Sequence, residues 1–162
     1  MNKLIDSIQK TFLILILSLA LFTNAFSQSN YQYECISIKD DGYITFKIWN
    51  PQKGKNYKFN QARKDAIYAI LVSGVPSNEN CASQKPLLQN QEGIEKFRDV
   101  EKEFFDNKGV WETFTRSSEI ETTMPVSLGK KEWKVYQVSV SKNLLRKYLE
   151  EKNIVKPLKT GF

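Results

Sequence analysis

The chain has 162 residues, enough for one domain, and its formal charge of +6 is moderate and spread along the sequence. It contains no histidine, which excludes Ser-His-Asp and Cys-His catalysis, histidine-ligated zinc and histidine pH switching. The even spread of charge argues against nucleic-acid binding. No motif in the sequence identifies a reaction or a ligand. The sequence therefore favours a non-enzymatic protein without a cofactor or metal.

Residues 1–27 have the organisation of a cleavable export signal. A weakly basic start precedes an apolar run over 12–22, which at about 1.5 Å per residue cannot cross a hydrocarbon core of roughly 30 Å. Small residues at the −3 and −1 positions predict cleavage after Ser27; an uncleaved membrane anchor is the alternative. No cysteine lies near that point, so we expect residues 28–162 to be periplasmic or extracellular and not an amino-terminal lipoprotein.

Two alternating stretches, 29–39 and 42–49, predict strands that form a β-hairpin. A three-residue loop over 40–42 suits them, because its last position favours a left-handed residue such as Gly42. Hydrophobic matching also favours this loop over a two-residue one. The cross-strand pairs that it predicts are Ile38–Ile44, Ile36–Phe46 and Tyr33–Trp49. In this register Cys35 shares the second face with Tyr33 and Trp49.

The rest of the chain predicts three helices and one clear strand. Asn60 and Ser141 are the expected caps of the first and last helices, which end at Gly74 and Asn153. The helices are expected over 61–73, 93–106 and 142–152, and the strand over 133–140. Residues 110–116 are ambiguous between helix and strand, and 117–131 is expected to be a loop with a short strand near 119–123. The last helix is expected to turn Leu144, Leu145, Tyr148 and Leu149 inward.

This order of elements indicates a single α+β domain. An amino-terminal β-hairpin and a carboxy-terminal strand would lie in a mostly antiparallel sheet, packed by about three helices.

Cys35 and Cys81 are the sharpest chemical signal. An even cysteine count in an exported chain predicts a disulfide, which would close a loop of about 47 residues and stabilise the fold by roughly 4 kcal/mol. It would bring residues 77–86 beside Tyr33 or Trp49. Two unpaired cysteines are the alternative, whereas a catalytic cysteine lacks a histidine to activate it.

Two groups of side chains are candidate binding surfaces. Tyr33, Tyr43 and Trp49 form a candidate contact surface, because tyrosine and tryptophan are favoured where a partner docks; packing under the Cys81 loop or a helix is the alternative. A cluster of basic residues forms a candidate anion patch that could attract an anionic partner. The alternative is that these residues are only a solvated loop and the start of a helix. The residues of the patch are Lys53, Lys55, Lys58, Arg63 and Lys64.

Four stretches, taken in order, carry a family resemblance. They are Asp41-Gly42-Tyr43 leading to Trp49, Gln61 to Ala66 with Gly74, Cys81 followed by Lys85-Pro86-Leu87, and Phe104-Phe105. Together they resemble a group of uncharacterised exported proteins of Bacteroidota-type Gram-negative bacteria, over nearly all of the mature chain.

More distantly, the Ala-Arg-Lys helix and the closing strand and helix are similar to envelope modules with a TolB-amino-terminal-like fold. That fold occurs in the curli-secretion pore family and in lipoprotein activators of penicillin-binding proteins. The resemblance implies protein–protein contact in the periplasm without catalysis. It does not imply pore formation, because this chain lacks the lipoprotein cysteine and the pore-forming strands.

We therefore expect a non-enzymatic exported protein that acts as a protein-interaction or adaptor module on another envelope protein. We expect no nucleic-acid partner and no transmembrane helix after signal removal. One alternative is a small envelope hydrolase or glycan-binding module, which would need a pocket with convergent carboxylates. Another is a basic binder that makes peripheral contact with the membrane surface through the cluster at 53–64.

Overall fold

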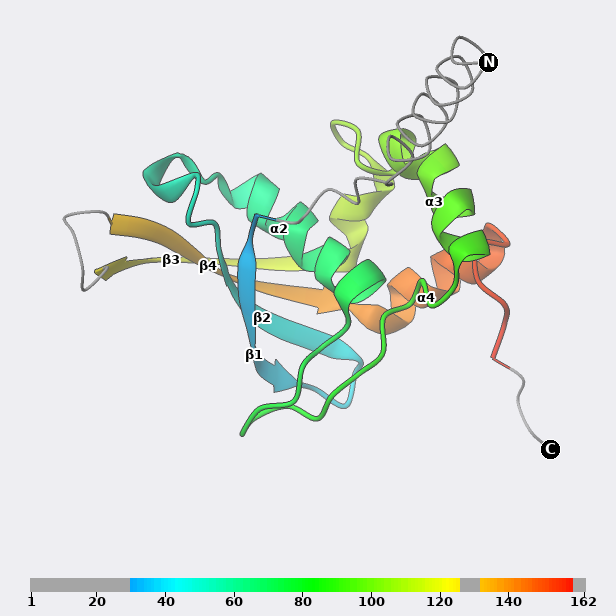
Figure 1. Ribbon diagram of the computed structural model, residues 1–162, viewed down its shortest axis with the longest axis horizontal. Helices are drawn as coiled ribbons and strands as arrows, with labels where there is room; N and C mark the ends of the chain where they lie inside the picture. Colours follow the sequence, from blue (N-terminus) through cyan, green and yellow to red (C-terminus); the bar gives the residue numbers. More distant parts are fainter. Residues whose placement is uncertain (1–29, 126–131, 159–162) are drawn as a thin grey trace, which may run out of the picture.

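Four strands form one antiparallel sheet in the order β1-β2-β4-β3 (Figure 1). The computed structural model describes residues 30–125 and 132–158, with side chains over 30–116 and 133–158, so the predicted export signal lies outside the described residues. The strands are β1 (Gln32–Ile38), β2 (Tyr43–Trp49), β3 (Thr115–Pro125) and β4 (Glu132–Ser141). The expected α+β class with an antiparallel sheet is confirmed.

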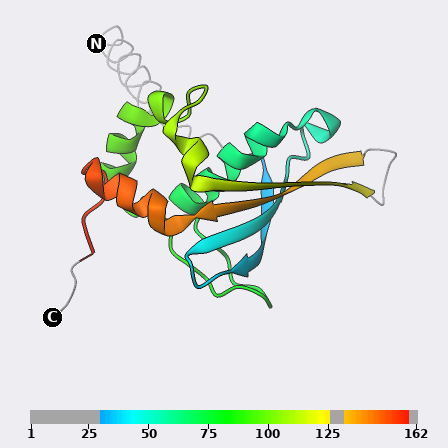
Figure 2. The ribbon, with the colours of Figure 1, turned by 180° about the vertical axis from the view of Figure 1, so that it is seen from behind.

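The helices lie on one face of this sheet and at one of its ends. The α-helices are α2 (Phe59–Tyr68), α3 (Gln91–Phe104) and α4 (Lys142–Glu151). Two short 3-10 helices, η1 (Gly54–Asn56) and η3 (Val110–Phe114), and a short π-helix, η2 (Ala69–Ser73), complete the set. Helix α2 crosses one face, and α3 and α4 stand beyond the sheet end (Figure 1). In the reverse view no helix passes in front of β2 and β4 (Figure 2). The sheet thus has a covered face and an open face.

The core forms between α2 and the covered face. Side chains from β2 and β4 that alternate toward α2 are almost completely inaccessible: Ile44, Phe46, Ile48, Tyr136, Val138 and Val140. Ala62 and Ala66 on α2 are fully buried as well. Because alanine is small, the helix backbone can lie close to the sheet.

The predicted hairpin register is correct near the turn and wrong beyond it. Ile38 pairs with Ile44 as expected, but the register shifts between Cys35 and Ser37, so Cys35 lies opposite Phe46. Ile36 is the extra residue of this β-bulge, and Tyr33 consequently lies opposite Ile48, not Trp49.

The bulge reverses the facing of the first half of β1. Tyr33 and Cys35 therefore point to the covered face, away from Trp49, and the Tyr33 ring meets the Phe46 ring edge-on at 5.5 Å. A bulge of one residue thus converts two side chains expected on the second face into core residues.

The predicted disulfide is present. Cys35 and Cys81 are bonded and both are buried, with Cα atoms 6.2 Å apart. The Cys81 loop therefore meets β1 on the covered face, not on the second face where it was expected. Just before this loop, the Gly74 carbonyl accepts from the Tyr33 hydroxyl at 3.0 Å. The Asn78 amide donates to the Cys35 carbonyl at 2.8 Å, which adds a second link between the loop and β1.

Helix ends follow local chemistry, with one exception. The Asn90 and Ser141 side chains accept from Gly93 N and Leu144 N and so cap α3 and α4. Asn153 ends α4 with a φ of 56°, as predicted. Asn60 is not a cap, because α2 begins one residue earlier, after Lys58.

Two further expectations are wrong in detail. Leu144 is 48% exposed and does not turn inward, whereas Leu145 and Leu149 are fully buried. The ambiguous segment is a 3-10 turn followed by a strand, and β3 continues to Pro125 where a loop with only a short strand was expected. The polar sequence of this segment does not indicate a strand. It forms one because its backbone pairs with β4.

Gly74 stops the helical segment at a position that only glycine fits. Its φ is +79°, and a Cβ there would lie 2.4 Å from the Gln84 carbonyl oxygen. We expect Gly74→Ala to lower the free energy of unfolding by about 1–3 kcal/mol in urea denaturation. The exposed Ser77→Ala should change it by less than about 0.5 kcal/mol, and an equal effect of both changes would contradict this account.

Candidate functional site

The open face of the sheet is the first candidate site. Alternation along the central strands places on this face Tyr43, Thr45, Lys47 and Trp49 from β2 and Trp133, Val135, Gln137 and Ser139 from β4. Thr45 and Ser139 lie directly opposite each other, and their hydroxyl oxygens are hydrogen-bonded at 2.8 Å. The two hydroxyl groups near the centre of the face therefore satisfy each other.

A cation covers one end of the open face. The Arg116 guanidinium carbon lies 3.9 Å from the centroid of the Tyr43 ring, and an Arg116 nitrogen lies 3.5 Å from an Asp41 carboxylate oxygen. Arg116 is exposed, whereas Tyr43 beneath it is only 8% exposed. This end presents a guanidinium to solvent, not a tyrosine.

Two tryptophans mark the other end. Trp49 pairs with Val135, so Trp133, two residues before Val135, is its diagonal neighbour on the same face. Both indoles are half-buried, and Val135 between them is fully buried. The Trp49 indole nitrogen is inaccessible and has no hydrogen-bond partner among the described residues.

The predicted contact surface is divided by this geometry. Tyr33 belongs to the covered face, where burial raises its hydroxyl pKa. Tyr43 and Trp49 share the open face but are six residues apart along β2, about 20 Å. Trp133 and Arg116 join them from β4 and β3. Alternation over 133–140 puts Trp133 on one face of its strand, and only the β2–β4 pairing shows that this is the face of Trp49.

The predicted anion patch is also divided. Arg63 donates to the Thr115 hydroxyl at 2.8 Å and stacks on Trp111, and Lys64 donates to the Phe105 carbonyl. These two cations therefore support the packing of α2 against η3. Lys53, Lys55 and Lys58 are the exposed members that remain.

A buried polar network joins η1 to α2. The Asp65 carboxylate, 7% exposed, accepts from the Tyr57 hydroxyl at 2.7 Å and from the Gln61 amide at 2.8 Å. The Tyr136 hydroxyl donates to the Tyr57 carbonyl at 3.1 Å. Burial, and then the neighbouring Asp65 charge, raise the pKa of Tyr57. The neutral tyrosine is thus held as a donor, and the network is structural.

Asp65 gives stability a defined pH dependence. Burial raises its pKa above the ordinary 3.8, although the hydrogen bonds from Gln61 and Tyr57 and the charge of Lys53 oppose this. The folded state therefore binds this proton more tightly than the unfolded state. The Asp65 contribution to stability should fall as pH rises from about 3.8 through the raised pKa.

Two substitutions separate the charge of Asp65 from its hydrogen bonds. Asp65→Asn removes the charge and keeps an acceptor oxygen for the Tyr57 hydroxyl, and its NH2 group can donate to the Gln61 amide oxygen once that amide turns over. Its free energy of unfolding at pH 7 should therefore stay within about 1 kcal/mol of wild type or exceed it. Asp65→Ala should lose about 1–3 kcal/mol, because the buried Tyr57 hydroxyl loses its acceptor. Urea denaturation between pH 4 and pH 7 measures both, and a large loss in Asp65→Asn would contradict the raised pKa.

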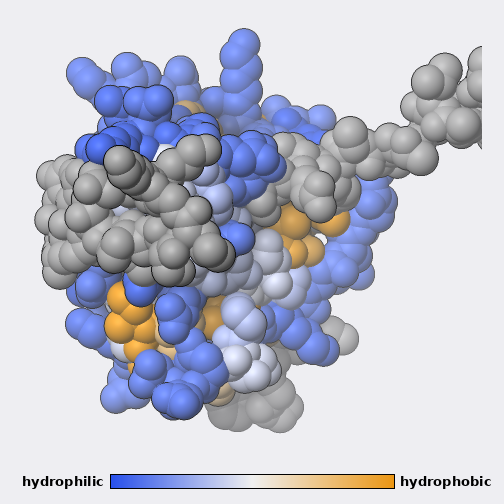
Figure 3. Space-filling model, turned by 60° about the vertical axis from the view of Figure 1, so that its left-hand side comes forward, coloured by the Kyte–Doolittle hydropathy of each residue, from blue (hydrophilic) through white to orange (hydrophobic). Residues whose placement is uncertain are grey.

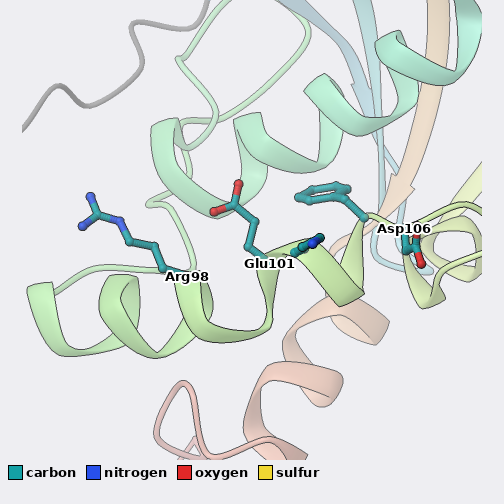
Figure 4. A pocket seen from close by; sticks show the side chains of 5 residues that line it. Arg98, Glu101 and Asp106 are labelled. Atoms are coloured by element: carbon teal, nitrogen blue, oxygen red, sulfur yellow. The ribbon is translucent and has the colours of Figure 1, made fainter.

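A depression on α3 is the second candidate site. It has a volume of about 460 Å³ and is lined by Arg98, Glu101, Lys102, Phe105 and Asp106 (Figure 4). The Glu101 side chain points from α3 toward the neighbouring helical segment of α2 and η2, whereas Arg98 is directed away from it (Figure 4). Burial raises the pKa of Glu101. No local pattern in the sequence distinguishes Glu101 from the other acidic residues of α3, so the sequence alone does not mark it.

Neither candidate site groups metal-ligating side chains among the described residues. In the described parts of the chain no three histidine, cysteine, aspartate or glutamate side chains are grouped so that they could hold a metal ion. Over residues 30–125 and 132–158, no helix is long and apolar enough to cross a membrane. Comparison with known protein families, curated proteins and solved structures finds no match to this chain.

Proposed function

We propose that this protein is an exported, non-enzymatic interaction module that binds another protein of the cell envelope through the open face of its sheet. The supporting observation is the composition of that face. Trp49 and Trp133 towards one end and the Arg116 guanidinium at the other are residue types that dominate binding energy at protein interfaces.

The edges of the sheet are less suited to binding than the open face. The bulge at Ile36 interrupts β1, and the Asn78 side chain occupies the Cys35 carbonyl. The pairing of β3 with β4 shifts between Ser117 and Glu121. Irregular edges oppose the addition of a further strand. These features favour recognition by side chains of the face over recognition by backbone pairing.

The hydropathy of the surface favours a protein partner over a lipid bilayer. Among the coloured residues in Figure 3, hydrophilic side chains predominate and the hydrophobic areas are small and separate. Export is supported by the Cys35–Cys81 disulfide, because such bonds persist in oxidising compartments, and by the signal expected over 1–27.

Site-specific photo-crosslinking in the native host tests this function. A photoreactive amino acid at Lys47, on the open face, should give a discrete adduct with one envelope protein. The same group at Lys147, an exposed position on α4, should not. Adducts of the same partner from both positions, or from neither, would contradict the proposal.

Substitution of Trp49 then measures how much this side chain contributes to the affinity for the partner. With the captured partner purified, Trp49→Ala should weaken binding by about thirtyfold, the loss typical of a tryptophan hot spot. Unchanged disulfide formation and circular dichroism serve as the folding control. An unchanged affinity would exclude the open face as the binding surface, and binding of isolated cell-wall glycan or anionic vesicles instead would favour the alternative functions.

A further inference from the structure

The depression on α3 lies on the helical side of the molecule, so it is independent of the open sheet face. Helix α3 is anchored through Phe97 and Phe104, which are buried, and the residues of the depression come from α3 and the turn that follows it. Within the depression the only half-buried side chains are those of Glu101 and Phe105; Arg98, Lys102 and Asp106 are exposed around them.

Glu101 is a half-buried carboxylate whose loss of hydration is not offset by a hydrogen bond or an ion pair from the described residues. No hydrogen bond or ion pair from the described residues reaches its side chain, although neighbouring Arg98 and Lys102 are cationic. The other charged side chains of α3 and α4 that are partly buried have a partner, as Glu150 has in Arg146 at 2.8 Å. A desolvated carboxylate costs free energy unless a cation or a donor satisfies it.

Phe105 supplies an apolar wall beside this carboxylate. Its ring stacks on Tyr68 at 5.0 Å with an interplanar angle of 11°, and the Phe104 ring meets it edge-on at 4.7 Å. The ring is thus held rigidly by α2 and by the core. A methylene chain could pack along such a wall while its charged end reached the carboxylate, as the side chain of lysine does.

We propose that this depression binds an alkylammonium group of the kind that a lysine side chain carries, with its nitrogen on the Glu101 carboxylate and its methylenes along Phe105. The volume of about 460 Å³ accommodates one such chain. Lys102 at the rim, and Lys64, whose ammonium nitrogen lies 5.9 Å from the centroid of the Phe105 ring, disfavour a polycation. Lys102 would attract an anionic group at the far end of the ligand.

An NMR titration of the exported, oxidised protein tests this site with three probes. Nα-acetyl-lysine methylamide represents a lysine residue of a protein, 6-aminohexanoate represents a free zwitterion, and Nα-acetyl-norleucine methylamide lacks the charge. The first, the second or both should shift the amide signals of residues 98–106, and the norleucine probe should not. Shifts from the lysine probe alone identify a lysine residue of a protein as the ligand, and shifts from 6-aminohexanoate alone identify a small zwitterion. Equal responses to all three probes, or none, would overturn the proposal.

Matched variants assign the binding to Glu101. Glu101→Gln keeps the size of the side chain and should weaken binding about tenfold, whereas Asp99→Asn makes the same charge change at an exposed position on α3 and should leave it unchanged. Glu101→Gln should also melt at the same temperature as wild type or above it, because a desolvated charge is removed. Equal weakening in both variants would mean that net charge, and not this pocket, attracts the probe.

Discussion

Replacing Cys35 and Cys81 together with alanine should lower the free energy of unfolding by about 4 kcal/mol. The bond joins residues 46 apart, and the chain-entropy estimate for a loop of that length gives this value. Domains of this size are stable by only about 5–15 kcal/mol, so a large share of the total would be lost. Urea denaturation of both proteins under oxidising conditions measures the difference.

Reduction of the wild-type protein provides the matched control. Wild type in reductant should show the same lowered stability as the double variant, and the double variant should not respond to reductant. The Asn78–Cys35 hydrogen bond does not replace the covalent link, so amides of residues 75–86 should become the least protected against hydrogen exchange. A loss below about 1 kcal/mol would show that the unfolded chain is not constrained by this bond in the expected way.

The disulfide also shows how far local patterns determine this fold. The pairing of the two cysteines followed from compartment and count, and the turn that ends at Gly42 followed from glycine's tolerance of a positive φ, which is 81° there. Caps at Ser141 and Asn153 are similarly local. All depend on interactions between residues close in sequence or on general chemistry, and the structure confirms each of them.

The errors that concern the candidate surfaces arise where segments far apart in the sequence meet. The bulge at Ile36 places Cys35 in the core, beside the loop that carries Cys81, and strict alternation could not signal it. The position of Trp49 and Trp133 on one face depends on the pairing of β2 with β4, which α2, α3 and β3 separate along the chain. The sequence contains these residues, but their assembly into one surface requires the strand order.

The cations of α2 illustrate the same limit for charge. Arg63 and Lys64 look like part of a basic surface, because Lys53, Lys55 and Lys58 precede them. In the structure they lie near the Trp111 ring, at 4.8 Å and 5.0 Å from its centroid. Their role is set by a tryptophan more than forty residues away, which charge patterning does not reveal.

Trp111→Ala should therefore be among the most destabilising single substitutions, with a loss of about 3–5 kcal/mol in the free energy of unfolding. Trp111 is 2% exposed, and its indole nitrogen donates to the Asp106 carbonyl at 2.9 Å. Truncation leaves a large cavity between α2 and η3 and removes the ring near Arg63 and Lys64. Thermal and urea denaturation should both report the loss.

Trp133→Ala is the matched control, because it removes the same side chain from a half-buried position on the open face. It should cost clearly less than Trp111→Ala, since less apolar area returns to water. Trp111→Phe should lie between wild type and Trp111→Ala, because it keeps a ring for the two cations but loses the hydrogen bond to Asp106. Equal losses in Trp111→Ala and Trp133→Ala would contradict the distinction between a covered face that stabilises the fold and an open face whose side chains contribute less to stability.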